Sequence, residues 1–294
     1  MPITQGARYM LLSTLFFALM NVCVKLLSHL PALEIILFRS GLSVLISYFT
    51  LRALRIRPWG SNHFLLVARG TTGALALILY FFTLQRMPLA TAVTIQYLAP
   101  IFTAILGIFL VHEQVRPWQW VFFLLSFAGV LVVEGVSADV DLRWVALGVL
   151  SAVFSGFSYN SIRRLKGKEH PLVVVFYFPM VALPIAGAYC LWNWVTPQGL
   201  DWLWLLLTGL LTQGAQVFMT KAYQAEKLSS VANLNYLGIL YALGLGFVFF
   251  GETFQLSSYL GMALVLLGVV LNTWYTARQP QQAVTVAPTE EVVA

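Results

Sequence analysis

The chain has 294 residues, of which 60% are hydrophobic and only 10% are charged, and its net charge at pH 7 is +6. Soluble domains carry roughly 25% charged residues, so this composition excludes a chain that covers its whole surface with water-facing side chains. The basic residues lie in short segments between apolar runs, which excludes a nucleic-acid-binding patch and follows the positive-inside rule of membrane proteins.

Apolar runs long enough to cross a bilayer recur along the chain. A hydrocarbon core of ~30 Å needs about 20 apolar residues per helix, and the sequence therefore predicts an all-α polytopic membrane protein with ten transmembrane helices. In chain order the predicted spans are 8–28, 32–51, 64–85, 89–111, 117–134, 143–162, 171–192, 202–222, 229–250 and 257–275. The polar residues 277–294 are predicted to form a disordered cytoplasmic tail.

The Lys and Arg residues also predict an orientation. With both termini in the cytoplasm, twelve of the 17 basic residues fall on the cytoplasmic side. The positive-inside rule therefore favours this topology, and we expect an integral protein of a bacterial inner membrane.

The chain contains an internal repeat. Residues 89–130 align with residues 228–269 at a constant spacing of 139. The recurring residues include Tyr97, Glu113 and Gly129, which return as Tyr236, Glu252 and Gly268. Each copy, 1–136 and 137–276, holds five predicted spans, and an odd number inverts the second copy in the membrane. Inverted repeats are typical of secondary transporters that alternate access around a central site, although some channels and membrane enzymes also arose by duplication.

Four segments carry a family resemblance. They read YLAPIFTAILGIFLVHEQVRPWQWVFFLLSFAGVLVV (97–133), NYLGILYALGLGFVFFGETFQLSSYLGMALVLLGVVLN (235–272), LEIILFRSGLSVL (33–45) and ARGTTGALALILYFFTLQRMPLATA (68–92). Together they resemble the EamA-type branch of the drug/metabolite transporter superfamily. The resemblance implies ten helices around a cavity lined mainly by spans 1, 3, 4, 6, 8 and 9. It also implies export, import or exchange of amino acids, nucleotide sugars, cofactors, sulfonium compounds or drugs.

Polar side chains inside the predicted spans are candidates for substrate binding. An amide or hydroxyl in hydrocarbon needs a partner, so these side chains should face the bundle interior or a wet cavity. The alternative for each is an interhelical hydrogen bond. The set comprises Asn21, Tyr80, Gln96, Tyr97, Tyr159, Asn160, Gln213, Gln216, Asn235 and Tyr236.

Two arginines also fall within predicted spans. Arg39 lies about seven residues into its span, roughly 10 Å deep, where a charge costs about 2.5–3.5 kcal/mol on insertion scales. It either holds an anionic substrate group or pairs with helix-end carbonyls or polar side chains of a neighbouring span. Arg69 lies nearer the end of its span and is expected to reach the lipid headgroups.

Each charged residue near a membrane face has two interpretations, a local structural role and a functional role. Lys25 and Glu34 flank one short loop and are expected to form an ion pair, or else a gate. Glu113 and Glu252 end equivalent spans, where capping or loop bracing is favoured over ion coupling.

Several chemistries have no motif in the sequence. There is no P-loop, no Asp or Glu at mid-membrane depth, no metal-ligand spacing among the four histidines and no catalytic motif of a hydrolase or metalloprotease. We therefore expect no enzyme activity, metal or cofactor, and partners limited to the bilayer and a small-molecule substrate, in a monomer or homodimer.

The resulting hypothesis is a secondary transporter that exports or exchanges an amino-acid-like or related amphipathic metabolite. The Phe-Arg of the second span and the Arg-Gly of the third resemble transporters of S-adenosylmethionine or riboflavin, which gives one alternative. A non-transporting scaffold or sensor is another, and a membrane-embedded enzyme is a third.

Overall fold

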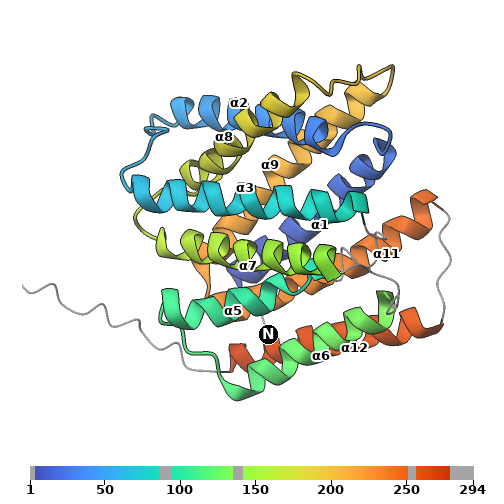
Figure 1. Ribbon diagram of the computed structural model, residues 1–294. Coiled ribbons are helices and arrows are strands. Elements are labelled where there is room, and N and C mark those ends of the chain that lie inside the picture. The colour runs from blue at the N-terminus through green and yellow to red at the C-terminus, as the bar shows by residue number, and fades with distance from the viewer. Residues whose placement is uncertain (1–3, 87–94, 135–141, 251–255, 279–294) are drawn as a thin grey trace, which may run out of the picture.

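The computed structural model describes residues 4–86, 95–134, 142–250 and 256–278, and all regular elements within these ranges are helices (Figure 1). They are α1 (Gln5–Leu26), α2 (Ala32–Ala53), α3 (His63–Arg86), α5 (Ala99–Leu110), α6 (Pro117–Glu134), α7 (Leu142–Arg164), α8 (Pro171–Cys190), α9 (Asp201–Ala225), α10 (Leu228–Val231), the 3-10 helix η1 (Ala232–Tyr236), α11 (Leu237–Phe250) and α12 (Leu256–Ala277).

Six of these helices, α1, α2, α3, α7, α8 and α9, are long and apolar enough to cross a membrane. The burial pattern of α2 shows why lipid is its outer solvent. Ser40, Ser43 and Ser47 are buried inside the bundle, whereas Leu45 and Phe49 are 53% and 65% exposed. A water-soluble helix would show the opposite pattern. The chain is a polytopic helical membrane protein, and the number of ten spans stays a prediction.

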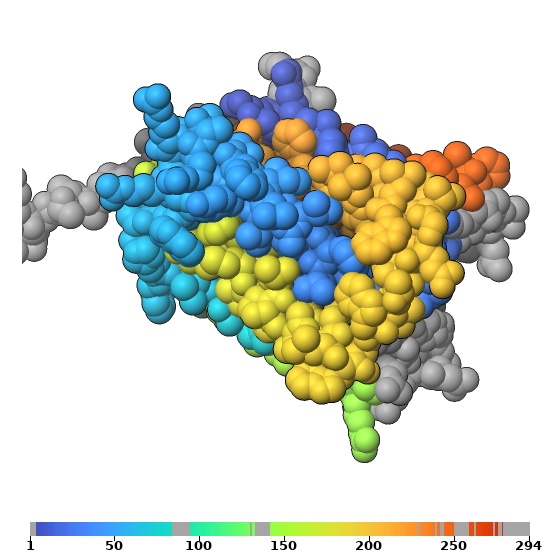
Figure 2. Space-filling view, turned by 90° about the horizontal axis from the view of Figure 1, so that it is seen from above, coloured from blue at the N-terminus to red at the C-terminus, as the bar shows by residue number. Residues whose placement is uncertain are grey.

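Helices from the two halves of the chain pack against each other. The main pairs are α1 with α9, α3 with α7, α2 with α8 and α6 with α12, and the next are α5 with α7, α1 with α11, α3 with α8 and α2 with α9. In Figure 1, α6 and α12 lie side by side apart from the other helices. Figure 2 shows α2 lying beside α8 and α9 on one face of the molecule.

This set of contacts is symmetric with respect to the two halves. Exchanging α1 with α7, α2 with α8, α3 with α9, α5 with α11 and α6 with α12 leaves the pairs α2–α8 and α6–α12 unchanged and converts each other pair named above into another member of the set. Contacts of this kind are what an approximate two-fold axis between the halves would produce.

The predicted span 229–250 is helical throughout but is not one uniform α-helix, because the 3-10 helix η1 lies between α10 and α11. Two asparagine side chains of η1 form hydrogen bonds to neighbouring helices. Asn233 Nδ2 donates to the carbonyl of Gly268 over 3.3 Å, and Asn235 Nδ2 donates to the hydroxyl of Tyr223 over 3.0 Å. Asparagine is a poor residue for a helix interior because its amide competes for such bonds.

The equivalent span of the first half, 89–111, lies partly outside the described residues. Its described part passes through a turn at Tyr97 and Leu98 before α5 begins. Pro100 therefore lies in the first turn of α5, where its missing N–H costs no helical hydrogen bond.

One end of the bundle, here called the basic end, contains the loops α2–α3 and α7–α8. The carboxylate of Glu169 in the second loop accepts hydrogen bonds from the backbone N–H groups of Ser61 and Asn62 in the first, at 2.5 Å and 2.6 Å. The hydroxyl of Tyr177 donates to the carbonyl of Trp59 over 2.7 Å. These bonds fix the two loops beside each other, on the left in Figure 1.

The opposite end contains the loops α1–α2 and α8–α9. His29 lies 3.0 Å from the carboxylate of Asp201, at the start of α9. The carboxylate of Glu34 is fully buried and accepts from the backbone N–H of Val195 over 3.0 Å. Each end of the bundle therefore has its own polar contacts between loops.

The contact of Glu169 generates a pH-dependent prediction. Burial alone would raise the pKa of Glu169, but the N–H groups of Asn62 and Ser61 and the Ser61 hydroxyl lower it below 4.5. Stability from a depressed carboxylate pKa is present above the unfolded-state pKa and is lost as pH falls through the folded-state pKa. We expect Glu169→Gln to cost about 1 kcal/mol at pH 7, measured by thermal unfolding in detergent.

The difference in melting temperature between the wild type and Glu169→Gln should shrink as pH falls below 4.5, the ordinary pKa. Lys168→Gln, which removes a neighbouring exposed charge, serves as the control. An unchanged difference between pH 7 and pH 4 would show that the charge of Glu169 contributes nothing.

Candidate functional site

Two arginines lie buried well inside the bundle. Arg39 from α2 and Arg69 from α3 are only 4% and 2% exposed. Their guanidinium carbons lie 6.0 Å and 5.2 Å from the ring centroid of Phe178 on α8. Cations within about 6 Å of a ring centroid are attracted to the ring face. Both positive charges therefore belong to one site, here called the arginine site.

Arg69 is held by neutral side chains from two further helices. Its Nη1 donates to the hydroxyl of Ser158 on α7 over 2.6 Å, and its Nη2 donates to Oε1 of Gln216 on α9 over 3.1 Å. Its Nε is buried and has no hydrogen-bond partner among the described residues. Gly73 has no Cβ, and a Cβ there would lie only 2.8 Å from the Phe178 ring. The missing side chain therefore leaves space beside that ring for the guanidinium of Arg69.

Arg39 has weaker contacts. Its Nη1 lies 3.9 Å from the sulfur of Met20 on α1, and a thioether is a weak acceptor. Within the part of the chain that the structure describes, neither Arg39 nor Arg69 forms an ion pair, and the ion pairs present lie elsewhere. The arginine site therefore carries two positive charges that no described carboxylate neutralises.

A wall of aromatic and amide side chains adjoins Arg69. The rings of Tyr159 on α7 and Tyr223 on α9 stack with centroids 5.0 Å apart. Both tyrosines lie near the guanidinium of Arg69. The hydroxyl of Tyr223 accepts from Asn235 in η1, which links the wall to the interrupted helix.

A second aromatic pair lies where the two interrupted spans meet. Tyr97 and Tyr236 occupy equivalent positions of the repeat, and their ring centroids are 5.9 Å apart. Tyr236 is fully buried, and its hydroxyl has no hydrogen-bond partner in the described ranges. Equivalent residues that touch each other lie close to any axis that relates the two halves.

Two of the predicted binding residues join neighbouring helices through hydrogen bonds. Gln213 donates to the hydroxyl of Ser47 over 2.8 Å and accepts from Ser43, which connects α9 to α2. Asn160 donates to the carbonyl of Thr103 over 3.0 Å, which connects α7 to α5. These two amides form interhelical hydrogen bonds, which were the alternative to substrate binding for each polar residue.

The remaining predicted residues are more dispersed. Gln96 binds the hydroxyls of Ser151 and Ser155 on α7, each over 3.1 Å. Tyr80 packs beside Phe81 toward the opposite end of α3. Asn21 is exposed on α1. None of the hydrogen bonds described for Gln96 reaches the arginine site.

Glu34 is held by the α8–α9 loop. One of its carboxylate oxygens binds the N–H of Val195, and the other is buried without a hydrogen-bond partner among the described residues. Lys25 is exposed near the end of α1. The ion pair between Lys25 and Glu34 stays a prediction, and Glu252 lies outside the described residues.

The expectation that Arg69 reaches the headgroups is wrong, because its side chain points inward and is buried. Its partners Ser158, Phe178 and Tyr223 are also absent from the predicted set. A sequence signal for the inward direction was available in Gly73, because a glycine one turn along a helix leaves space for a long side chain.

An ion pair connects the segment after α5 to the last turn of α7, near the basic end. Arg163 Nε lies 2.8 Å from Glu113 Oε1, and both side chains are 8% exposed. The other oxygen of Glu113 accepts from the N–H of Leu228 at the start of α10 over 2.7 Å. Arg163 also donates to the carbonyl of Gln224 over 3.2 Å. The bracing role predicted for Glu113 is confirmed, and it ties α5, α7, α9 and α10 together.

We expect the Glu113–Arg163 pair to be strongly coupled. Removing one partner leaves the other charge buried, which costs about 3–5 kcal/mol. Glu113→Gln and Arg163→Met should each lower the stability by that order, while the double variant should lose much less than the sum. Chemical unfolding in detergent, with the exposed Arg164→Gln as a control, measures the coupling, and additive losses would contradict it.

Comparisons with known proteins agree with this architecture. The sequence profile of the EamA-like transporter family matches residues 4–134 and again residues 142–274. A solved structure described as "Crystal structure of protein" superposes with a TM-score of 0.84 at 16% identity, covering 93% of this chain and 98% of that one, and so shows the same fold.

Named relatives match over most of the chain. The pseudopaline exporter CntI of Pseudomonas aeruginosa (strain UCBPP-PA14) is 30% identical over 269 residues, covering 90% of this chain and 95% of the exporter. Human solute carrier family 35 member G1 is 27% identical, covering 92% of this chain and 80% of that protein. A riboflavin transporter of Rhizobium johnstonii is 28% identical, covering 94% of each chain.

Two family matches that together span nearly the whole chain, a relative at 30% identity and a bundle of membrane helices around a buried polar site lead to one assignment. The chain belongs to the EamA-like transporter family and is a membrane transporter of small molecules.

Proposed function

We propose that the chain transports a small organic anion with a carboxylate group, amino-acid-like in character, and that it works by export or exchange. The observation that carries this proposal is the pair of buried guanidinium groups at Arg39 and Arg69, which no described carboxylate neutralises. A charge buried without compensation is strongly unfavourable, and a substrate carboxylate would supply the missing charge.

The side chains around Arg69 suit such a substrate. Guanidinium and carboxylate form short, charge-assisted hydrogen bonds that are about twice as strong as neutral ones. Ser158 and Gln216 fix the guanidinium from one side, and the Nε donor is still available. The ring of Phe178 and the stacked tyrosines would contact the apolar part of an amphipathic molecule.

The relatives support export of a small metabolite. The exporter from Pseudomonas aeruginosa is named for pseudopaline, and two of the transporters are named for riboflavin. A flat cofactor-like solute is therefore the second candidate. It is favoured by the stacked pair Tyr159 and Tyr223, because aromatic rings bind flat rings by offset stacking.

Alternating access would follow from the two-fold arrangement of the halves. The symmetric helix contacts and the twofold family match support two inverted repeats, 1–136 and 137–276. Transporters of this kind open each end in turn around a fixed central site. The ion pair Glu113–Arg163 would then stabilise the state in which the basic end is closed. By the positive-inside rule this end faces the cytoplasm of a bacterial inner membrane, with both termini on that side.

The uncompensated charges also favour exchange over one-way movement. A carrier that closes around an empty arginine site must remove water from two charged guanidinium groups. A carrier loaded with substrate closes around an arginine site whose charge the substrate neutralises. An additional barrier of about 3 kcal/mol, the order of one buried charge, slows the empty step by roughly two orders of magnitude.

The export test compares excreted metabolites. A bacterial strain expressing the wild type should release a small set of carboxylate-bearing compounds that a strain expressing Arg69→Gln does not release, because the variant loses the anion-binding charge. Untargeted mass spectrometry of the medium is the measurement. Arg69→Lys, which keeps the charge and loses the forked donors, should retain part of the release.

Arg164→Gln removes an exposed arginine of α7 and is the matched control. Equal release by Arg69→Gln and the wild type, with equal amounts of folded protein in the membrane, would contradict the proposal. Enrichment of neutral flavin-like compounds instead of carboxylates would favour the second candidate.

The exchange test uses proteoliposomes. Uptake of a released carboxylate, labelled with an isotope, should be at least about tenfold faster into vesicles preloaded with the unlabelled compound than into empty vesicles. Equal rates would show that the empty carrier reorients freely, which would refute exchange and leave the binding role of Arg69 intact.

A further inference from the structure

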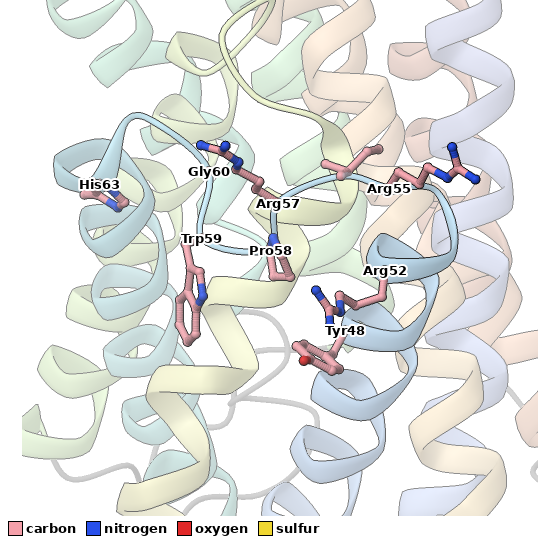
Figure 3. A pocket seen from close by; sticks show the side chains of 9 residues that line it. Tyr48, Arg52, Arg55, Arg57, Pro58, Trp59, Gly60 and His63 are labelled. Carbon is pink, nitrogen blue, oxygen red and sulfur yellow. The ribbon is translucent and has the colours of Figure 1, made fainter.

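A basic pocket lies at the basic end, between the last turn of α2 and the first turn of α3 (Figure 3). Its volume is about 650 Å³. The lining residues that matter for its chemistry are Tyr48, Arg52, Arg55, Arg57, Trp59 and His63. It shares no residue with the arginine site, so it calls for a separate explanation.

The three arginines line the pocket from different directions. In Figure 3, Arg52 extends below the loop beside Tyr48, Arg57 extends above the loop, and Arg55 points away from both. The guanidinium of Arg52 lies 6.0 Å from the ring centroid of Tyr48, which orients it by a cation–π contact. Arg52 and Arg57 therefore place positive charge on two sides of the same pocket.

The charge of the pocket is positive even with its acidic neighbour included. Glu169 lies next to Gly60, and its carboxylate is engaged by the N–H groups of Ser61 and Asn62. His63 contacts the hydroxyl of Tyr177 with its Nδ1 over 3.4 Å. The arginines are exposed, and none of them forms an ion pair among the described residues.

The surface next to the pocket is apolar. Leu45 and Phe49 on α2 are 53% and 65% exposed, and Phe64 and Val67 on α3 are 81% and 48% exposed. On a membrane protein such side chains face acyl chains. Trp59 is 58% exposed and lies between the basic pocket and this apolar surface. Indole side chains take such positions at the headgroup level of a membrane.

We propose that this pocket binds the phosphate of an anionic phospholipid, with Arg52 and Arg57 as the phosphate ligands. A lipid headgroup and free phosphate both offer a phosphate group to the pocket. The adjoining apolar surface favours the lipid, because the lipid also has acyl chains. Basic pockets between membrane helices are suited to anionic headgroups, and the guanidinium group of an arginine binds phosphate through forked donors. The acyl chains would lie along the exposed faces of α2 and α3.

The test is thermal unfolding of the full-length protein in neutral detergent with added phosphatidylglycerol, phosphatidylcholine or inorganic phosphate. Phosphatidylglycerol should raise the melting temperature of the wild type with saturation. Each arginine near an anionic surface contributes about 1 kcal/mol. The double variant Arg52→Gln/Arg57→Gln should therefore need roughly 25-fold more lipid for half the effect.

The matched control is Arg164→Gln/Lys168→Gln, which removes two exposed charges from the same end outside the pocket. It should respond to phosphatidylglycerol as the wild type does, and so should Arg69→Gln, because the pocket is separate from the arginine site.

Three outcomes would overturn the assignment. An equal loss in both double variants would reduce the effect to general surface charge. An equal shift with inorganic phosphate would replace the lipid by the free ion. An equal shift with phosphatidylcholine would remove the need for an anionic headgroup.

Discussion

Burial of two guanidinium groups that no carboxylate among the described residues neutralises is the constraint on which the rest of the bundle depends. An arginine cannot release its proton in a protein, so its surroundings must satisfy the charge. Arg69 receives a hydroxyl, an amide oxygen and an aromatic ring from α7, α9 and α8. Arg39 receives the same ring and a sulfur. These partners come from both halves of the chain, so the arginine site exists only when the halves are packed together.

The contacts at the two ends of the bundle complement this central site. At the basic end, Glu113, Arg163 and the start of α10 form a buried, fully bonded brace. At the opposite end, Glu34 holds the α8–α9 loop through one oxygen while the other has no partner among the described residues.

Much of the fold follows from the sequence, because apolar runs of span length and a repeat at constant spacing both reflect the bilayer directly. The interruption of the span 229–250 does not follow, because Asn233 and Asn235 break the helix only when Gly268 and Tyr223 lie within reach. The direction of Arg69 is similar, since an arginine near a helix end reaches either the headgroups or the interior, depending on its neighbours.

For the predicted polar residues, too, the sequence indicates that a partner is needed but not which partner each side chain reaches. Their presence in apolar spans indicates that partners are needed, and Gln216 contacts Arg69. Gln213 and Asn160 instead hold helices together, because which amide meets a charge and which meets a serine or a carbonyl is decided by helix packing. Composition and spacing carry no information on that choice.

The most direct test of the central claim is thermal unfolding of the purified protein with pairs of metabolites that differ only in a carboxylate and the corresponding amide. A ligand at 100 times its dissociation constant stabilises by about 2.7 kcal/mol. We expect stabilisation by the carboxylates, none by the corresponding amides, and no stabilisation by either in Arg69→Gln. Equal stabilisation by both members of a pair, or an unchanged response in Arg69→Gln, would contradict the assignment of the two buried arginines as the anion site.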